Sequence, residues 1–240
     1  MPDVYLYDDV PVLKNKLGIK DSDLLDAAEA GMSRANMMLL YESEFQDFSP
    51  AGLCEIHHRL FDEVYEWAGK FRTINIEKRE RILAGRSVWY SNDDNIPADL
   101  HSAFDKLLIQ PWNNFSREKF ALALARYFPP IWQVHPFREG NTRSVVMMMS
   151  LFVEHHGFYM DYELLAASAG YVRDSFVMAS LGQFSEFEHL EKILLDTVCS
   201  DPVSYDETSD SPRAGGSSKA EKYSKYQKEP YKPEPHYEKP

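Results

Sequence analysis

Apolar residues recur at every third or fourth position along most of the first 200 residues, which is the spacing of one buried face of an α-helix. Capping residues, and prolines that suit the first position of a helix, mark where the helices begin. The clearest apolar stripe consists of Leu53, Ile56, His57, Leu60, Phe61 and Val64. We expect one helix from Asp21 to about Ser43, and further helices starting at Ser49-Pro50, Ile96-Pro97, Ser116, Asn141, Asp161-Tyr162 and Ser185.

Residues 70–92 break this helical pattern. Two short β-favouring runs, Arg72–Ile76 and Ser87–Tyr90, are separated by charged residues and Gly85. This arrangement is typical of a β-hairpin inserted in a helical protein, and a plain surface loop is the alternative. The predicted fold class is therefore all-α: a helical bundle with a small β-hairpin at about 72–90 and a disordered C-terminal tail.

The tail is predicted from composition, because the chain after Val203 contains no Val, Ile, Leu, Met, Phe, Trp or Cys. Such a segment has no large apolar side chains to offset the entropy of ordering, so residues 200–240 are expected to be a disordered, low-complexity tail. No Gly/Ser-rich linker or internal repeat interrupts the preceding residues. Residues 1–199 are accordingly predicted to form one domain with an N-terminal helical extension.

Charge and composition exclude several classes of protein. The formal net charge of −12 argues against broad binding to nucleic acid or to an anionic membrane, although a local basic patch is left open. The two cysteines provide no disulfide framework and fit a reducing compartment. The acidic residues Asp3, Asp8 and Asp9 do not fit a secretory signal, and the apolar run Val145–Val153 is too short to span a bilayer. The cytoplasm is therefore the expected location.

The segment WQVHPFREGNTRSVVMMM, residues 132–149, places polar and charged residues directly before an apolar run. Pro136 and Gly140 disfavour helix before Asn141, so we expect a loop followed by a buried helix. The first turn of such a helix offers free backbone N–H groups and the positive end of the helix dipole. This helix start is therefore a candidate binding site for an anion.

The side chains around this helix start suit phosphate chemistry. Gly140 has no side chain to block a phosphate, Asn141 can cap the helix or donate to an oxygen, and Arg143 adds a planar fork of donors. Glu139 offers an oxygen ligand for Mg²⁺ shared with phosphates, and His135 can accept a proton near neutral pH. The segment predicts a phosphate cradle with a metal ligand and a general base. A polar loop ahead of a core helix is the alternative.

The nine residues HPFREGNTR at 135–143 also resemble the signature H-P-F-x-[DE]-G-N-x-R of the Fic/Doc family. The resemblance extends over roughly residues 10–195. HHRLFDEVYEWAGKFRTINIEK is similar to the family's approach to its flap, a β-hairpin over the active site that positions the target, and ILAGRSVWYS resembles the returning strand. FALALARYFPPIWQVHPF resembles the helix that leads into the signature loop.

The resemblance implies a role for each matching residue. His135 would be the general base, and Glu139 would bind Mg²⁺ that bridges the α- and β-phosphates of ATP. The nucleotide-binding set that it implies is Arg138, Gly140, Asn141, Thr142 and Arg143. Tyr171, which follows the signature helix, is a further candidate for packing near adenine. The target-binding set in the flap is Thr73, Ile74 and Asn75, which would hold the target segment by strand addition.

The family's usual reaction moves AMP from ATP onto a Ser, Thr or Tyr hydroxyl of a protein and releases pyrophosphate. The expected function is therefore that of a protein adenylyltransferase with Mg²⁺ as cofactor. Its partners would be ATP and a target protein, which can be the protein itself. The alternatives are transfer of another group on the same scaffold (phosphate, a different nucleotide or phosphocholine) and a non-catalytic binding module. The resemblance makes a bacterial cytoplasm the default location, and secretion as an effector is left open.

Two positions depart from the family pattern. Thr142 stands where the family often has Gly, and its hydroxyl is compatible with a phosphate contact. Val146 stands where a second arginine usually clamps the γ-phosphate and pairs with an inhibitory glutamate, so weaker holding of that phosphate is expected. The nearest match to an inhibitory motif, Thr73–Glu77, lies in the flap and lacks the following Gly or Asn. Control by a separate inhibitory chain or by homo-oligomerisation is left open.

The histidine pair His57-His58 does not suggest a metal site. Neighbouring side chains on a helix point about 100° apart, so they cannot share one ion. We expect one packed and one exposed histidine.

Overall fold

The computed structural model describes residues 3–203 and 224–226, so most of the tail predicted to be disordered lies outside the described residues. Two compact units can be distinguished. The first contains the residues up to 76 together with 90–109 and 134–152, and the second contains 77–89, 110–133 and the described residues from 153 onward. The prediction of one domain over residues 1–199 stays a prediction.

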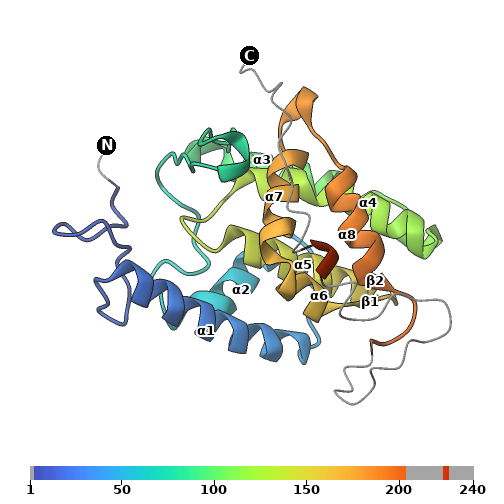
Figure 1. Ribbon diagram of the computed structural model, residues 1–240, viewed down its shortest axis with the longest axis horizontal. Helices are drawn as coiled ribbons and strands as arrows, with labels where there is room; N and C mark the ends of the chain where they lie inside the picture. The colour runs from blue at the N-terminus through green and yellow to red at the C-terminus, as the bar shows by residue number, and fades with distance from the viewer. Residues whose placement is uncertain (1–2, 204–223, 227–240) are drawn as a thin grey trace. The chain divides into compact units, whose positions relative to one another are not determined.

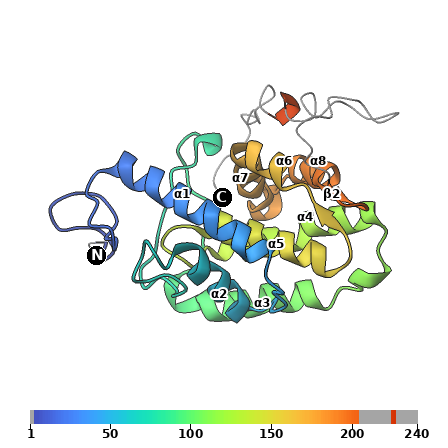
Figure 2. The ribbon, with the colours of Figure 1, turned by 90° about the horizontal axis from the view of Figure 1, so that it is seen from below.

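The first unit is built from α1 (Ser22–Tyr41), α2 (Pro50–Phe61), the 3₁₀ turn η2 (Asp93–Asn95), α3 (Ile96–Leu108) and most of α5 (Asn141–His155). Helix α1 packs along α2, and α2 packs on α3 (Figure 2). Periodic apolar positions of these helices are buried, among them Leu53, Ile56, Phe61, Leu100, Phe104, Val145 and Met148. The periodic apolar spacing in the sequence thus becomes the core of this unit.

The second unit contains α4 (Arg117–Val134), which runs up to the unit's boundary, α6 (Tyr162–Ala167), α7 (Ala169–Ala179) and α8 (Glu188–Thr197). Its shorter elements are η1 (Arg81–Leu83), η3 (Trp112–Asn114), η4 (Gly182–Phe184), β1 (Tyr159–Met160) and β2 (Val198–Cys199). Helices α7 and α8 lie side by side (Figure 1). The two strands pair antiparallel, with Tyr159 opposite Cys199 and Met160 opposite Val198. The helical fold class is confirmed.

The predicted helix starts at Asp21, Ser49 and Asp161 are confirmed by their caps. The side chain of Asp21 accepts the N–H of Leu24, Ser49 accepts the N–H of Gly52, and Asp161 accepts the N–H of Leu164. The last helix is the exception, because it begins at Glu188 rather than at Ser185. The hydroxyl of Ser185 instead accepts the N–H of Leu181 at 2.9 Å, so it closes the preceding turn.

The β-hairpin expected at 72–90 is not formed, and no strand is assigned to these residues, all of which the structure describes. In the second unit the chain reverses through η1, where Ala84 and Gly85 both have positive φ. Backbone bonds from Glu80 N–H to Arg86 C=O and from Gly85 N–H to Glu80 C=O, both at 3.0 Å, close this reversal. The carboxylate of Glu80 binds Arg173, and Arg81 binds Asp174 at 2.7 Å, so ion pairs to α7 hold the segment. Side-chain anchoring has replaced the ladder that propensity predicted.

Residues 224–226 of the tail form a single helical turn that contacts α8 through Tyr226. Tyr226 is buried, and its hydroxyl donates to the Asp196 carboxylate at 2.7 Å. Its ring meets that of Tyr171 edge-on with centroids 4.7 Å apart. These residues therefore depart from the predicted disorder, because an aromatic ring offers burial that the tail's Ser, Pro and Lys residues do not.

Within the described ranges, 3–203 and 224–226, no helix combines the length and the apolarity needed to cross a membrane.

Candidate active site

His135 is the first residue after α4, and its backbone turns the chain out of that helix. Its φ is +51°, a left-handed conformation that is costly for a residue with a side chain. The side chain is fully buried in the structure. The imidazole stacks on the ring of Tyr90, with centroids 4.1 Å apart and an interplanar angle of 29°. The loop placement predicted for His135 is observed, and its backbone geometry is that of a strained site.

Arg72 holds this strained turn in place. Its side chain is buried, and its guanidinium donates to the carbonyls of His135 at 2.9 Å and Ser91 at 2.5 Å. It also donates to the carbonyl of Ile74 at 2.6 Å, while the backbone N–H of Arg72 donates to Pro136 C=O at 2.8 Å. The planar fork of an arginine is suited to several carbonyls at once. Arg72 therefore joins both ends of the predicted flap to the loop of His135.

Asn141 closes the loop between His135 and α5. Its Oδ1 accepts the N–H of Phe137 at 2.9 Å, and its Nδ2 donates to the carbonyl of Phe137 at 2.8 Å. The buried ring of Phe137 anchors the loop. Because both polar atoms of the Asn141 amide bind backbone, any phosphate at this helix start would meet the backbone N–H groups of α5 rather than this side chain.

Gly140 is required by the packing as well as by the turn. Its φ is +79°, and a Cβ atom at this position would lie 2.4 Å from the Phe61 ring of α2. A larger residue would therefore force apart the start of α5 and α2. The close approach of backbone and ring explains the glycine without reference to any ligand.

His57 on α2 fixes the position of Glu139. Its Nδ1 accepts the N–H of Gly69 at 2.8 Å, so Nε2 carries the proton and donates to the carbonyl of Glu139 at 3.0 Å. Burial lowers the pKa of His57 to about 3, which keeps the imidazole neutral. The ring stacks on Phe137 with centroids 3.8 Å apart, whereas the side chain of His58 is 49% exposed. The expected pair of one packed and one exposed histidine is confirmed.

The carboxylate of Glu139 is partly exposed, and its Oε1 accepts the N–H of Gly140 at 3.1 Å. Among residues 3–203 and 224–226, no group of three or more His, Cys, Asp or Glu side chains could hold a metal ion. A single carboxylate at a helix start nevertheless fits Mg²⁺, which takes one or two protein carboxylates and completes its shell with phosphates and water.

The two arginines of the signature both pair with carboxylates of the first unit. Arg143 forms an ion pair with Glu29 of α1 and donates to Ser33 Oγ at 3.0 Å. The remaining oxygen of Glu29, which is itself buried, accepts the hydroxyl of Tyr65. Arg138 pairs with Asp3 at 2.7 Å. A phosphate that binds either guanidinium would replace a carboxylate already present.

Other predicted residues lie as follows. Thr142 and Val146 are partly exposed on α5. Thr73 donates its N–H to the Tyr5 hydroxyl at 3.1 Å, and the side-chain oxygen of Asn75 accepts the N–H of Asp93 at 3.0 Å. Both contacts belong to an irregular segment rather than to a strand edge. The role of Thr73, Ile74 and Asn75 in target binding stays a prediction.

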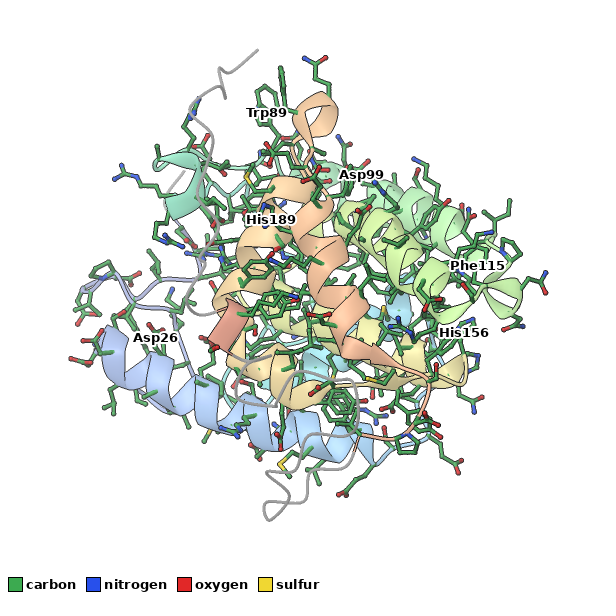
Figure 3. The ribbon with its side chains drawn as sticks, turned by 45° about the vertical axis from the view of Figure 1, so that its right-hand side comes forward. Asp26, Trp89, Asp99, Phe115, His156 and His189 are labelled. Atoms are coloured by element: carbon green, nitrogen blue, oxygen red, sulfur yellow. The ribbon has the colours of Figure 1, made fainter. Side chains whose placement is uncertain are left out.

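Tyr171 lies at the start of α7, in the second unit, and is buried. Its hydroxyl is 2.9 Å from Nδ1 of His189, a residue of α8 that is labelled in Figure 3. Its predicted place beside adenine stays a prediction.

The sequence did not reveal the contacts by which four residues shape the site. These residues are Glu29, His57, Arg72 and Tyr90. Helical spacing identified His57 and Glu29 only as residues of their helices. Arg72 lies in the run WAGKFRT, which carries part of the family resemblance, and this was the one available signal.

Comparison with known proteins gives a consistent result. Residues 47–153 match the family model described as "Fic/DOC family". A protein adenylyltransferase of Bartonella henselae is 30% identical over 200 residues, which are 79% of this chain and 36% of that protein. A probable protein adenylyltransferase of Sinorhizobium fredii is 27% identical over 66% of this chain and 79% of its own length. The chain thus spans about a third of the first relative's length.

Solved structures share the fold. The N-terminal Fic domain of a VirB-translocated Bep effector protein from Bartonella quintana has a TM-score of 0.67 and 25% identity, and the match covers 81% of this chain and 91% of that one. The BepC protein of Bartonella tribocorum, solved with bound AMPPNP, has a TM-score of 0.70 and 23% identity over 82% of this chain and 97% of that one.

Proposed function

The chain belongs to the Fic/DOC family, and from this premise we propose that it is a protein adenylyltransferase that uses ATP and Mg²⁺. The acceptor would be a Ser, Thr or Tyr hydroxyl of a protein. The observation that carries the proposal is the loop from His135 to Arg143, in which a strained histidine, a carboxylate and a glycine-linked helix start are held by buried contacts. Strain of this kind is retained where function requires it.

The proposed reaction is one in-line displacement. The acceptor oxygen bonds to the α-phosphorus of ATP, the bond from that phosphorus to the bridging oxygen breaks, and pyrophosphate leaves with the electron pair. The hydroxyl proton passes to the imidazole of His135. The backbone N–H groups at the start of α5 stabilise charge on the phosphates, so the acceleration comes mainly from positioning and electrostatics.

Glu139 would hold the Mg²⁺. When bound, this ion neutralises phosphate charge and orients the triphosphate. The contact from His57 fixes the backbone of Glu139, so the carboxylate starts from a defined place on the loop. Arg143 would turn from Glu29 to the β- or γ-phosphate. Without an arginine at Val146, the γ-phosphate would be held less firmly than is usual in the family.

The experiment is incubation of the purified protein with ATP labelled at the α-phosphate. We expect labelled protein, which includes self-labelling, and loss of the label in His135→Ala. His58→Ala is the matched control, because this neighbouring histidine is half-exposed on α2 and lies outside the loop. A wild-type protein that transfers no label from the α-phosphate to any protein of a lysate would refute the proposal. Thermal unfolding of both variants shows whether the fold is kept.

A non-catalytic nucleotide- or protein-binding module is the second candidate. Three observations favour it: Val146 in place of the clamp, the complete burial of His135, and the pairing of Arg143 with Glu29. Nucleotide binding in calorimetry together with no transfer from any labelled donor would establish it. Label that arrives only from the γ-phosphate would instead indicate a kinase-like transfer, and a screen of other donors covers further nucleotides and phosphocholine.

The setting proposed for this activity is a bacterial cell, because the named relatives are bacterial proteins. The cytoplasm is the default. Delivery as an effector is the alternative, since the Bartonella quintana protein with the same fold is described as translocated. Control by a second chain or by a homo-oligomer stays part of the proposal.

A further inference from the structure

The aromatic ring stacked on His135 comes from Tyr90, a partly exposed residue at the end of the segment expected to form the flap. The ring centroids are 4.1 Å apart and the planes differ by 29°, so the π face of the phenol lies against the imidazole. Tyr90 has no role in the proposed reaction as described above.

Arg72 ties the two stacked residues together. One guanidinium donates both to the carbonyl of His135, at 2.9 Å, and to the carbonyl of Ser91, the residue after Tyr90, at 2.5 Å. The backbones that carry the two rings are therefore fixed to the same group. Because Arg72 is buried, this link is shielded from competition by water. The position of the two stacked rings is therefore set by the backbone that Arg72 holds.

The charges around the imidazole give the stack a chemical consequence. The Arg72 guanidinium lies on the carbonyl side of His135, and a buried cation opposes the formation of a second positive charge nearby. Asp93, which interacts electrostatically with Arg72, offsets part of that charge. The face of an aromatic ring attracts a cation, most strongly where water is excluded. Tyr90 can therefore favour the imidazolium at a position where Arg72 disfavours it.

We propose that Tyr90 is a positioning residue for the AMP transfer: its π face fixes the plane of the His135 imidazole and stabilises the imidazolium that forms as the acceptor hydroxyl loses its proton. The inference rests on the proposed function. Neutral imidazole gains little from the ring quadrupole, whereas imidazolium gains more. The interaction therefore strengthens on the way to the transition state, and only such interactions raise the rate of the chemical step.

The test compares Tyr90→Phe, which keeps the π face, with Tyr90→Leu and Tyr90→Met, which fill the space without one. Initial rates of label transfer from α-labelled ATP are measured against pH. We expect Tyr90→Phe to stay within about 2-fold of wild type. The two aliphatic variants should lose between about 2- and 30-fold in kcat with the KM for ATP unchanged, which is the range that a cation–π contact corresponds to. Tyr159→Leu, on β1 and 39% exposed, is the control for loss of a tyrosine elsewhere.

The pH profile separates positioning from simple damage. Loss of the π face removes support for the imidazolium, so the acid limb of the rate should move to lower pH in the aliphatic variants. A merely structural role would lower the rate at every pH and leave the limb where it is. A readout without activity is the proton resonance of the His135 ring, identified by its loss in His135→Gln. The ring current of the aromatic side chain at position 90 should shift this signal in wild type and in Tyr90→Phe, and the shift should be absent in Tyr90→Leu.

The outcomes are distinguishable. Suppose that the wild type labels protein. If the aliphatic variants then have the same rate as wild type, or if the acid limb of their pH profile does not move, the role of Tyr90 is refuted and the proposed function is retained. A His135 resonance unaffected by Tyr90→Leu also overturns it, because the stack would then be absent in solution. A wild type that transfers no label removes the proposed function and this role together.

Discussion

Replacing Arg72 with lysine keeps the positive charge but removes the planar fork on which the site is built. The guanidinium donates to three backbone carbonyls at short range: those of Ile74 at 2.6 Å, Ser91 at 2.5 Å and His135 at 2.9 Å. A lysine carries its three donors on one nitrogen, which cannot approach three carbonyls that surround a flat group. We expect the ammonium group of the Arg72→Lys variant to satisfy about one of the three.

The cost follows from the two bonds that are lost. A hydrogen bond to a charged group contributes about 1.5–3 kcal/mol, so Arg72→Lys should lower the free energy of unfolding by roughly 3–6 kcal/mol. Single domains are usually stable by only about 5–15 kcal/mol, so this is a large fraction of the total. The released carbonyl of His135 should also relax the positive φ of that residue, so transfer from ATP should fall further than stability alone accounts for.

The assay is urea unfolding followed by circular dichroism and by tryptophan emission. Arg59→Lys is the matched control, because Arg59 is half-exposed and forms one ion pair with Glu55 of the same helix at 2.7 Å. Such a pair contributes less than about 1 kcal/mol. If Arg72→Lys unfolds within about 1 kcal/mol of wild type with the same m-value, then the carbonyl cluster is not what holds the loop, and the reasoning fails.

Three further perturbations test other contacts of the site. Glu29→Gln removes the charge that pairs with Arg143 and so frees the guanidinium for a phosphate. Calorimetry should show ATP binding at least about fivefold more tightly, which corresponds to a gain of about 1 kcal/mol in binding free energy. Equal affinity would argue against a phosphate role for Arg143. Burial holds the pKa of His57 at about 3, below its ordinary value of 6.5, so between these values the unfolded chain binds a proton that the folded protein does not. In the absence of metal ions and nucleotide, this group should therefore lower the free energy of unfolding by roughly 3 kcal/mol as the pH falls from 6.5 to 4, and His57→Gln should flatten that part of the urea-derived profile. Gly140→Ala should lower the free energy of unfolding by about 2–4 kcal/mol in the same assay, because of the positive φ and the overpacking against Phe61. Gly31→Ala, at an open position of α1, should raise it by up to about 1 kcal/mol. Equal effects of the two substitutions would contradict the packing argument.

The sequence was most informative where a local rule decides the structure. Asp21, Ser49 and Asp161 each accept a backbone N–H near the helix start that they were expected to cap. The loop from His135 and the helix from Asn141 followed from proline, glycine and the apolar run after them. These predictions depend on a few neighbouring residues and need no knowledge of the rest of the chain.

Long-range contacts decided what local rules missed. The runs at 72–76 and 87–90 favour strands, yet ion pairs to α7 hold the reversal at Glu80 and Arg81, and no ladder forms. Arginine is usually exposed, and only the contacts of Arg72 with the carbonyls of Ile74, Ser91, Val134 and His135 reveal why it is buried. The pairing of Arg143 with Glu29 joins residues 114 positions apart. No periodicity or motif contains such information, because it arises when the helices pack.

AMP transfer by the loop of His135 is measured most directly in one lysate with two forms of ATP. Wild type, His135→Ala and His58→Ala are each added with ATP labelled either at the α- or at the γ-phosphate. We expect a protein band labelled only from the α-phosphate, present with wild type and His58→Ala and absent with His135→Ala. Label from the γ-phosphate alone, or an α-label that survives in His135→Ala, would contradict it.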